Sequence, residues 1–238
     1  APSCIPARAA LFTGRTQRTH GRVGYQDGVP WNYQRYLAEE FTNNGYQTQA
    51  IGKMHVFPER SQCGFQNVIL HDGHLHFARK NSKGCLEIID DYTPWLREKT
   101  GNPNADYFEH GLSCNSFVAR PWDKAEELHP TNFVVTQGID FLRRRDPRKP
   151  FFLYLSFHRP HPPPDPPAWA LEQYLDMEIP EPPVGGWASL FAEHYSCRSD
   201  LSAGKLRPDV FRRARAAYYA SITHIDHQIN RFIEYIGD

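Results

Sequence analysis

A reactive side chain, Cys4, stands at the start of a short helix-forming segment, residues 3–15. The segment is rich in alanine and ends near Gly14, which is a typical helix stop, while Ser3 is a candidate N-cap. The free N–H groups of the first turn and the positive end of the helix dipole would then face the sulfur. Arg8 lies one turn further on, where its guanidinium can reach back toward Cys4. Such a site attracts an oxyanion and lowers the pKa of a thiol.

A second polar group, Lys53 and His55, directly follows a predicted strand over residues 46–51. This segment alternates and carries β-branched residues, and in open α/β sheets ligands bind beyond the carboxyl ends of the strands. Lysine supplies a compact positive charge, histidine supplies a directional donor, and Gly52 allows the backbone to turn so that both face one anion. Taken alone, the tetrapeptide fits a surface lysine and a packing histidine equally well.

A third polar group follows a nearly continuous apolar run over residues 151–157, which is typical of a parallel strand buried on both faces. The loop after it, residues 158–167, contains six prolines together with His158 and His161. Prolines limit the conformations of the unfolded loop, so such a loop holds its polar side chains in place at low entropic cost.

These segments resemble the signatures of the type I sulfatases, a branch of the alkaline-phosphatase-like superfamily. Cys-x-Pro-x-Arg followed by Leu-Phe-Thr-Gly, residues 4–14, resembles the motif whose cysteine is converted to formylglycine. Residues 45–55 resemble the glycine-rich segment that ends in Gly-Lys-x-His. Ser-Phe-x-x-Pro-His-x-Pro, residues 156–163, resembles a third recurring segment. The details are most similar to bacterial arylsulfatases and choline sulfatases.

The resemblance implies hydrolysis of a sulfate ester, with formylglycine derived from Cys4 as the nucleophile. It implies that Arg8 holds the formylglycine hydrate and that Lys53 and His55 bind the sulfuryl oxygens. His161 matches the histidine on the leaving-group side, where it would bind the ester and protonate the departing alkoxide. These five residues are the candidate catalytic residues, and Lys53, His55 and His161 are also the candidate substrate-binding residues. His158 does not match the pattern.

The resemblance also implies cofactors and partners. The family binds a calcium ion or another divalent metal, and Cys4, as formylglycine, would be one ligand. The other ligands are an aspartate pair near the N-terminus and an aspartate with Asn or His after the last helix, and this sequence carries neither set. We therefore expect this chain alone to bind metal poorly and to be inactive. A formylglycine-generating enzyme or an anaerobic maturing enzyme would be a partner.

Composition excludes some other classes of protein. Among 238 residues, 40% are hydrophobic, and Lys plus Arg equals Asp plus Glu at 27 each, so nothing indicates a nucleic-acid partner. No run is apolar enough to predict a membrane span. The five cysteines form no C-x-x-C pair, which argues against a zinc ribbon or a disulfide framework. The sequence begins without an initiator Met, so we expect a fragment, and the compartment (bacterial cytoplasm or periplasm) stays open.

The elements that would position these residues follow an α/β pattern. We expect a mostly parallel central sheet flanked by helices on both faces, alkaline-phosphatase-like and incomplete, with residues 1–238 forming part of a single sulfatase N-terminal catalytic domain. Asn32 and Gly45 would bound one helix, and further helices are predicted over residues 131–145 and 208–236. Residues 168–202 are rich in Pro, Gly and Trp and are predicted to be irregular.

Several alternatives stay open. His71, His74 and His76 have a spacing that suits metal binding, but a polar loop near the substrate is the more common arrangement. The acidic pair Asp90–Asp91 predicts a solvated turn or a helix start. The same formylglycine motif occurs in phosphonate monoester and phosphodiester hydrolases. A non-catalytic binding module and a thiol enzyme with unmodified Cys4 are the remaining alternatives.

Overall fold

The computed structural model describes residues 3–73, 89–107, 109, 111–112, 114–190 and 206–237. It divides into two compact units. Unit 1 comprises Ala1–Gly101 and Phe133–His158, and unit 2 comprises Asn102–Asn132 and Arg159–Asp238. Because the relative placement of the units is not determined, each is described by itself. The assignment of the whole chain to one catalytic domain stays a prediction.

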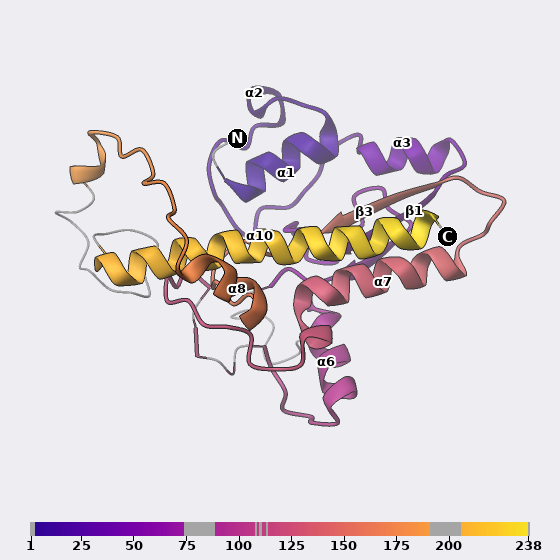
Figure 1. The fold of residues 1–238 in the computed structure, drawn as a ribbon. Coiled ribbons are helices and arrows are strands. Elements are labelled where there is room, and N and C mark those ends of the chain that lie inside the picture. Colours follow the sequence, from indigo (N-terminus) through magenta and orange to yellow (C-terminus); the bar gives the residue numbers. More distant parts are fainter. Residues whose placement is uncertain are drawn as a thin grey trace. The chain divides into compact units, whose positions relative to one another are not determined.

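The centre of unit 1 is a parallel three-stranded sheet with the order β2-β1-β3 (Figure 1). The strands are β1 (Gln47–Gly52), β2 (Asn67–Leu70) and β3 (Phe151–Ser156). Gly52 pairs with Leu70 on one side and with Ser156 on the other, so the three strands end level with one another. The predicted α/β class is confirmed, and the polar residues after each strand gather at one edge of the sheet.

Helices flank this sheet, with α1 (Cys4–Thr13) and α3 (Leu37–Asn43) on one side and α7 (Pro130–Arg144) on the other (Figure 1). Two shorter elements of the same unit are α2 (Gln17–His20) and α6 (Tyr92–Thr100). The core between α1 and the strands is aromatic, and the Phe12 ring packs edge-on against Tyr154 at 5.4 Å between centroids. α1 ends at Gly14, as predicted, in the left-handed conformation.

Three details of unit 1 differ from the sequence prediction. The helix expected from Asn32 begins only at Leu37, because the preceding aromatic residues pack as a loop in which Trp31 donates its backbone N–H to the Phe57 carbonyl at 2.8 Å. The side chains of β3 are partly exposed and not buried on both faces, except at Ser156. Ser3 occupies the N-cap position of α1, but its hydroxyl makes no capping hydrogen bond.

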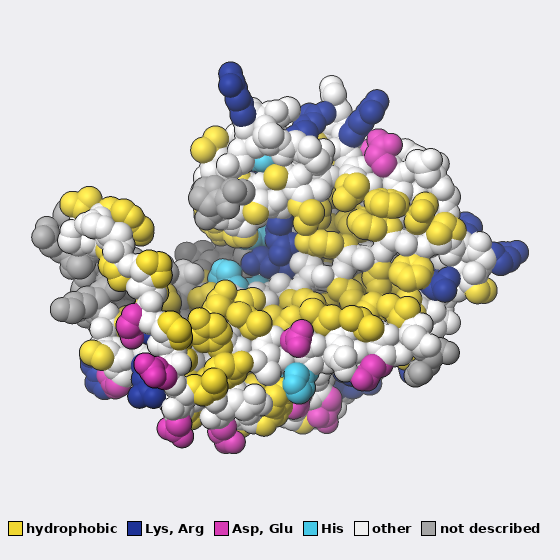
Figure 2. All heavy atoms as spheres, turned by 45° about the horizontal axis from the view of Figure 1, so that its top comes forward, with side chains coloured by type: hydrophobic (Ala, Val, Ile, Leu, Met, Phe, Trp, Pro, Cys, Tyr) yellow, Lys and Arg dark blue, Asp and Glu magenta, His cyan; other side chains and the backbone are white. Residues whose placement is uncertain are grey.

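Unit 2 is built on α10 (Pro208–Gly237), which confirms the helix predicted over residues 208–236. The segment expected to be irregular from residue 168 begins instead with α8 (Ala168–Leu175), because its helix formers follow Pro167 and bury one side against α10. A short 3₁₀ turn covers Glu126–Leu128. Exposed large hydrophobic side chains run along α10 (Figure 2): Tyr218, Tyr219, Ile222, Ile229, Ile233 and Ile236.

Beside its hydrophobic cluster, unit 2 also buries several polar side chains. Arg159 and Asp165 form a fully buried bidentate ion pair that closes the proline-rich loop between them. His129 Nε2 lies 3.3 Å from the backbone carbonyl of Asp165. His224 Nε2 lies 2.7 Å from Asn132 Oδ1, so that two histidines are satisfied without charge. None of the described helices is both long enough and apolar enough to cross a membrane.

Candidate active site

Cys4 is the first residue of α1 and is half-buried. Burial alone would raise the pKa of its thiol, but the His55 imidazole, the positive charge of Lys53 and the backbone N–H of Ile5 outweigh burial. The pKa of Cys4 therefore lies below its ordinary value, in the direction that the sequence predicted. The surroundings of this sulfur stabilise negative charge on the reacting atom.

Arg8 ties α1 to the strand ends. Its Nη1 donates to the Lys53 carbonyl at 2.6 Å, to the Tyr154 hydroxyl at 2.9 Å and to the Ser156 hydroxyl at 3.0 Å. The predicted reach back toward Cys4 is not among its hydrogen bonds. The guanidinium instead binds the residue after β1 and two side chains in the C-terminal half of β3. The guanidinium thus fixes the helix that carries Cys4 relative to the segment that carries Lys53.

Gly52 makes the turn from β1 into the site. It has φ +97°, and a Cβ at this position would lie 2.0 Å from the carbonyl oxygen of Ser156. The same oxygen accepts the backbone N–H of Lys53 at 2.9 Å. The predicted turn at Gly52 is confirmed, since only glycine allows this approach. That Lys53 and His55 face one anion stays a prediction. The Lys53 side chain that follows is 3% exposed.

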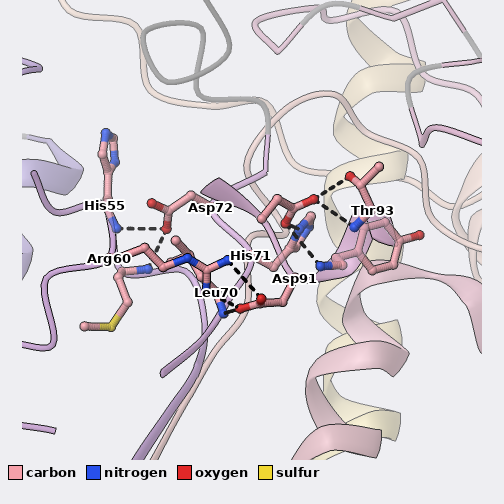
Figure 3. Close-up of polar contacts among 10 residues, drawn as sticks. His55, Arg60, Leu70, His71, Asp72, Asp91 and Thr93 are labelled. Carbon is pink, nitrogen blue, oxygen red and sulfur yellow. Dashed lines mark hydrogen bonds and ion pairs between the residues drawn. The ribbon is translucent and has the colours of Figure 1, made fainter. Parts of the chain in front are cut away.

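His55 is buried and has a left-handed backbone with φ +54°. Its backbone N–H and that of Met54 both donate to Asp72 Oδ1, at 2.9 and 2.6 Å, and its ring points away from that carboxylate (Figure 3). The ring Nε2 lies 3.2 Å from Asp27 Oδ1. Burial would lower the pKa of His55, but Asp27, Cys4 and Asp72 outweigh it and raise that pKa.

Sequence reasoning missed both of these aspartates. Asp72 lies two residues beyond β2, and a polar residue directly after a strand is a sequence signal for a site residue. The four-residue strand itself was not predicted, so this signal was missed. Asp27 lies in a loop without hydrophobic periodicity, and nothing in the sequence singles it out. One oxygen of Asp72 is engaged by the 54–55 backbone, while its Oδ2 is buried and has no hydrogen-bond partner in the described part of the chain.

The acidic pair Asp90–Asp91 lies at the start of α6, which was one of the two predicted arrangements. The Asp90 side chain, however, is not solvated. It is buried, accepts from the Thr93 backbone at 2.9 Å and lies 2.9 Å from His71 Nδ1. Burial raises the pKa of Asp90, but His71 and Thr93 outweigh it and lower that pKa. Asp91 forms a bidentate pair with Arg60 (Figure 3). The other two members of the histidine cluster, residues 74 and 76, lie outside the described residues.

The remaining candidates lie after β3. His158 belongs to unit 1, where its buried ring packs so closely that a Cβ on Gly73 would lie 2.3 Å from it. His161 belongs to unit 2 and is half-buried, and its Nδ1 donates to the Pro162 carbonyl at 2.8 Å. The structure thus brings Cys4, Lys53 and His55 together, and the approach of His161 to them stays a prediction.

A metal ion does not fit the described residues. Among residues 3–73, 89–107, 109, 111–112, 114–190 and 206–237, no group of three or more His, Cys, Asp or Glu side chains is arranged to hold one. The groups beside Cys4 are the cation Lys53 and the imidazole of His55, whose raised pKa favours a second positive charge.

Comparisons with known proteins give one consistent family. The family model described as Sulfatase matches residues 1–238. An arylsulfatase of Clostridium perfringens is 55% identical over 98% of this chain and 49% of its own length, and a choline-sulfatase of Rhizobium meliloti is 27% identical over 98% and 44%. The crystal structure of a phosphonate monoester hydrolase of Agrobacterium radiobacter superposes with a TM-score of 0.70 at 20% identity, over 98% of this chain and 49% of that one. The chain spans about half the length of these curated relatives.

Proposed function

Because this chain belongs to the sulfatase family, we propose that the protein containing it hydrolyses a sulfate ester at Cys4 after conversion of that residue to formylglycine. The observation that carries the proposal is the gathering of Lys53 and His55 around the sulfur of Cys4, at the N-terminus of α1. A sulfate ester presents anionic oxygens, and these groups offer it a positive charge and a directional donor at the positive end of the helix dipole.

In the unmodified chain, the sulfur of Cys4 occupies the place where the reacting oxygen of the formylglycine hydrate would lie. One hydroxyl of the hydrated formylglycine passes its proton to the lone pair of the neutral His55 ring and attacks the sulfur of the ester. The bond from that sulfur to the leaving alkoxide breaks, and a sulfated hydrate forms. Its second hydroxyl then loses a proton, the carbonyl re-forms, and sulfate departs with its bridging oxygen. Lys53, together with the His55 imidazolium formed by the first proton transfer, stabilises the charge that develops on the sulfuryl oxygens. Through its hydrogen bonds, Arg8 holds α1 against the C-terminal ends of β1 and β3 throughout the reaction.

His161 is the proposed acid for the alkoxide. Its Nδ1–H is committed to the Pro162 carbonyl, so Nε2 is the atom that would deliver the proton and the ring must be an imidazolium to do so. A positioned acid contributes about 10² to 10⁴ in rate. We propose calcium, or another divalent metal held largely by residues beyond this sequence, and a formylglycine-forming enzyme as further requirements of the whole protein.

The test compares a nitrophenyl sulfate with a nitrophenyl phosphodiester as substrates of the complete protein. We expect turnover of the sulfate, loss of it in Cys4→Ala and Lys53→Ala, and a Cys4 peptide whose mass shows an aldehyde in place of the thiol. Asp140→Asn is the matched control, since Asp140 lies on α7 and, among the described residues, pairs with Arg144. Preferential turnover of the phosphodiester, or full activity in Cys4→Ala, would reject the proposal. Metal-dependent turnover by residues 1–238 alone would refute the expectation that this chain is inactive.

A further inference from the structure

The ring of His55 is held at one edge by a carboxylate. Its Nε2 lies 3.2 Å from Asp27 Oδ1, and the other oxygen of Asp27 accepts a hydrogen bond from the Tyr25 hydroxyl at 2.6 Å. The Tyr25 ring also packs edge-on against the imidazole, with 5.8 Å between centroids. A carboxylate only accepts, so Nε2 must carry a hydrogen whether the ring is neutral or charged. The neutral ring then has its lone pair on Nδ1.

The backbone of His55 is held independently. Asp72 accepts its N–H, the backbone is left-handed with φ +54°, and the ring points away from Asp72 (Figure 3). Within the described part of the chain, Nδ1 is buried and has no hydrogen-bond partner of ordinary geometry. Cys4 is the reactive group beside this ring, because the imidazole and the thiolate each stabilise the charged form of the other. Two carboxylates therefore fix the main chain and one ring edge, and the remaining ring nitrogen is available to the reacting group.

The surroundings of Asp27 do not suit substrate binding. The pocket that it lines together with Ile5 and Trp31 has a volume of about 20 Å³, which is room for a single water and far below a small-molecule site of about 300 Å³ or more. An anionic ester would also be repelled by the carboxylate. Asp27 therefore acts through another residue.

We propose that Asp27 is a positioning residue that holds His55 as the Nε2–H tautomer, so that Nδ1 faces the reacting group at position 4. This inference rests on the proposed function for its catalytic consequence, although the tautomer can be measured without it. A neutral His55 released from Asp27 can rotate and carry its hydrogen on either nitrogen. In half of these states Nδ1 no longer offers a lone pair to a hydroxyl of the formylglycine hydrate.

The test uses the complete protein labelled with ¹⁵N-histidine, with the His55 signals assigned by their loss in His55→Gln. At a pH where the ring is neutral, the ¹⁵N shifts report which nitrogen carries hydrogen. We expect a pure Nε2–H tautomer in the wild type, a mixture in Asp27→Ala, and recovery in Asp27→Asn, whose side-chain oxygen still accepts. Asp140→Asn should leave the spectrum unchanged, because the partner of Asp140 in the described part of the chain is Arg144, on the same helix.

Kinetics with a nitrophenyl sulfate supply the second readout. Asp27→Ala should lower kcat about 100-fold, as expected for a misplaced catalytic group, with KM changed less than about threefold. Asp27→Asn should recover most of kcat. An unaltered tautomer in Asp27→Ala, or an asparagine variant as slow as the alanine variant, would overturn the proposal. A wild type with the expected tautomer but no turnover of sulfate esters would reject the proposed function and leave the positioning role of Asp27 in place.

Discussion

Replacing Gly52 by alanine tests the close approach that builds the site. Both Gly52 and Gly45 have positive φ, +97° and +83°, so alanine at either position carries strain of about 1–2 kcal/mol. At Gly45 nothing lies within 4 Å of the added Cβ, whereas at Gly52 the Ser156 oxygen would lie 2.0 Å away. Relieving that contact moves β3 off β1 and loses the hydrogen bond from the Lys53 N–H, which is worth about 1 kcal/mol.

Overpacking adds about 1–3 kcal/mol at Gly52, so Gly52→Ala should cost about 3–6 kcal/mol of unfolding free energy against about 1–2 kcal/mol for Gly45→Ala. The larger value is a substantial part of the stability of a typical domain, about 5–15 kcal/mol. Urea unfolding of the two variants, followed by far-ultraviolet circular dichroism, measures the difference. Equal urea midpoints for Gly52→Ala and Gly45→Ala would refute the reasoning. Backbone strain alone, without the contact with Ser156, predicts the same loss of stability in both variants.

Three further outcomes follow from the buried polar groups and the thiols. Arg159→Met should cost about 3–5 kcal/mol of unfolding free energy in urea, because the buried Asp165 carboxylate loses its guanidinium partner. The double variant Arg159→Met/Asp165→Leu should recover much of this loss, and additive losses would contradict the reasoning. Burial is the main cause that lowers the pKa of His224 to about 2, so the folded protein holds this ring neutral. The free energy of unfolding is therefore unaffected by His224 above its unfolded pKa of 6.5 and falls by about 2 kcal/mol by pH 5, because the unfolded chain takes up the proton. His224→Gln should reduce this loss of stability between pH 6.5 and pH 5. Burial raises the pKa of Cys63 to about 12 while that of Cys4 is lowered, so iodoacetamide at pH 8 should label an unmodified Cys4 first, as peptide masses would show.

Much of unit 1 was predictable because its signals are local. The helix after Cys4 follows from its alanines and the glycine at its end, and the turn at Gly52 follows from a strand that runs into polar residues. The sequence therefore predicts three of the site residues as a group, Cys4, Lys53 and His55, and the structure brings them together.

The remaining features depend on contacts between distant segments. Nothing in a loop without periodicity indicates that Asp27 lies beside His55, since 28 residues separate them. The three partners of Arg8 could not be predicted from helix geometry, because the strand ends compete with Cys4 for the guanidinium. Asp90 was expected in solvent, but a tertiary contact with His71 compensates for its burial.

The hydrogen bonds of Arg8 also have a consequence for the order in which the protein is made. Its partners lie 45 to 148 residues further along the chain. At about 5–20 residues per second, a ribosome adds Ser156 roughly 7–30 s after Arg8. For nearly all of that interval at most one of these three partners, the Lys53 carbonyl, has been added to the chain. The ten-residue helix that begins at Cys4 is marginal in water by itself. Cys4 is therefore presented on a nascent, largely unfolded segment well before the pocket that later encloses it exists.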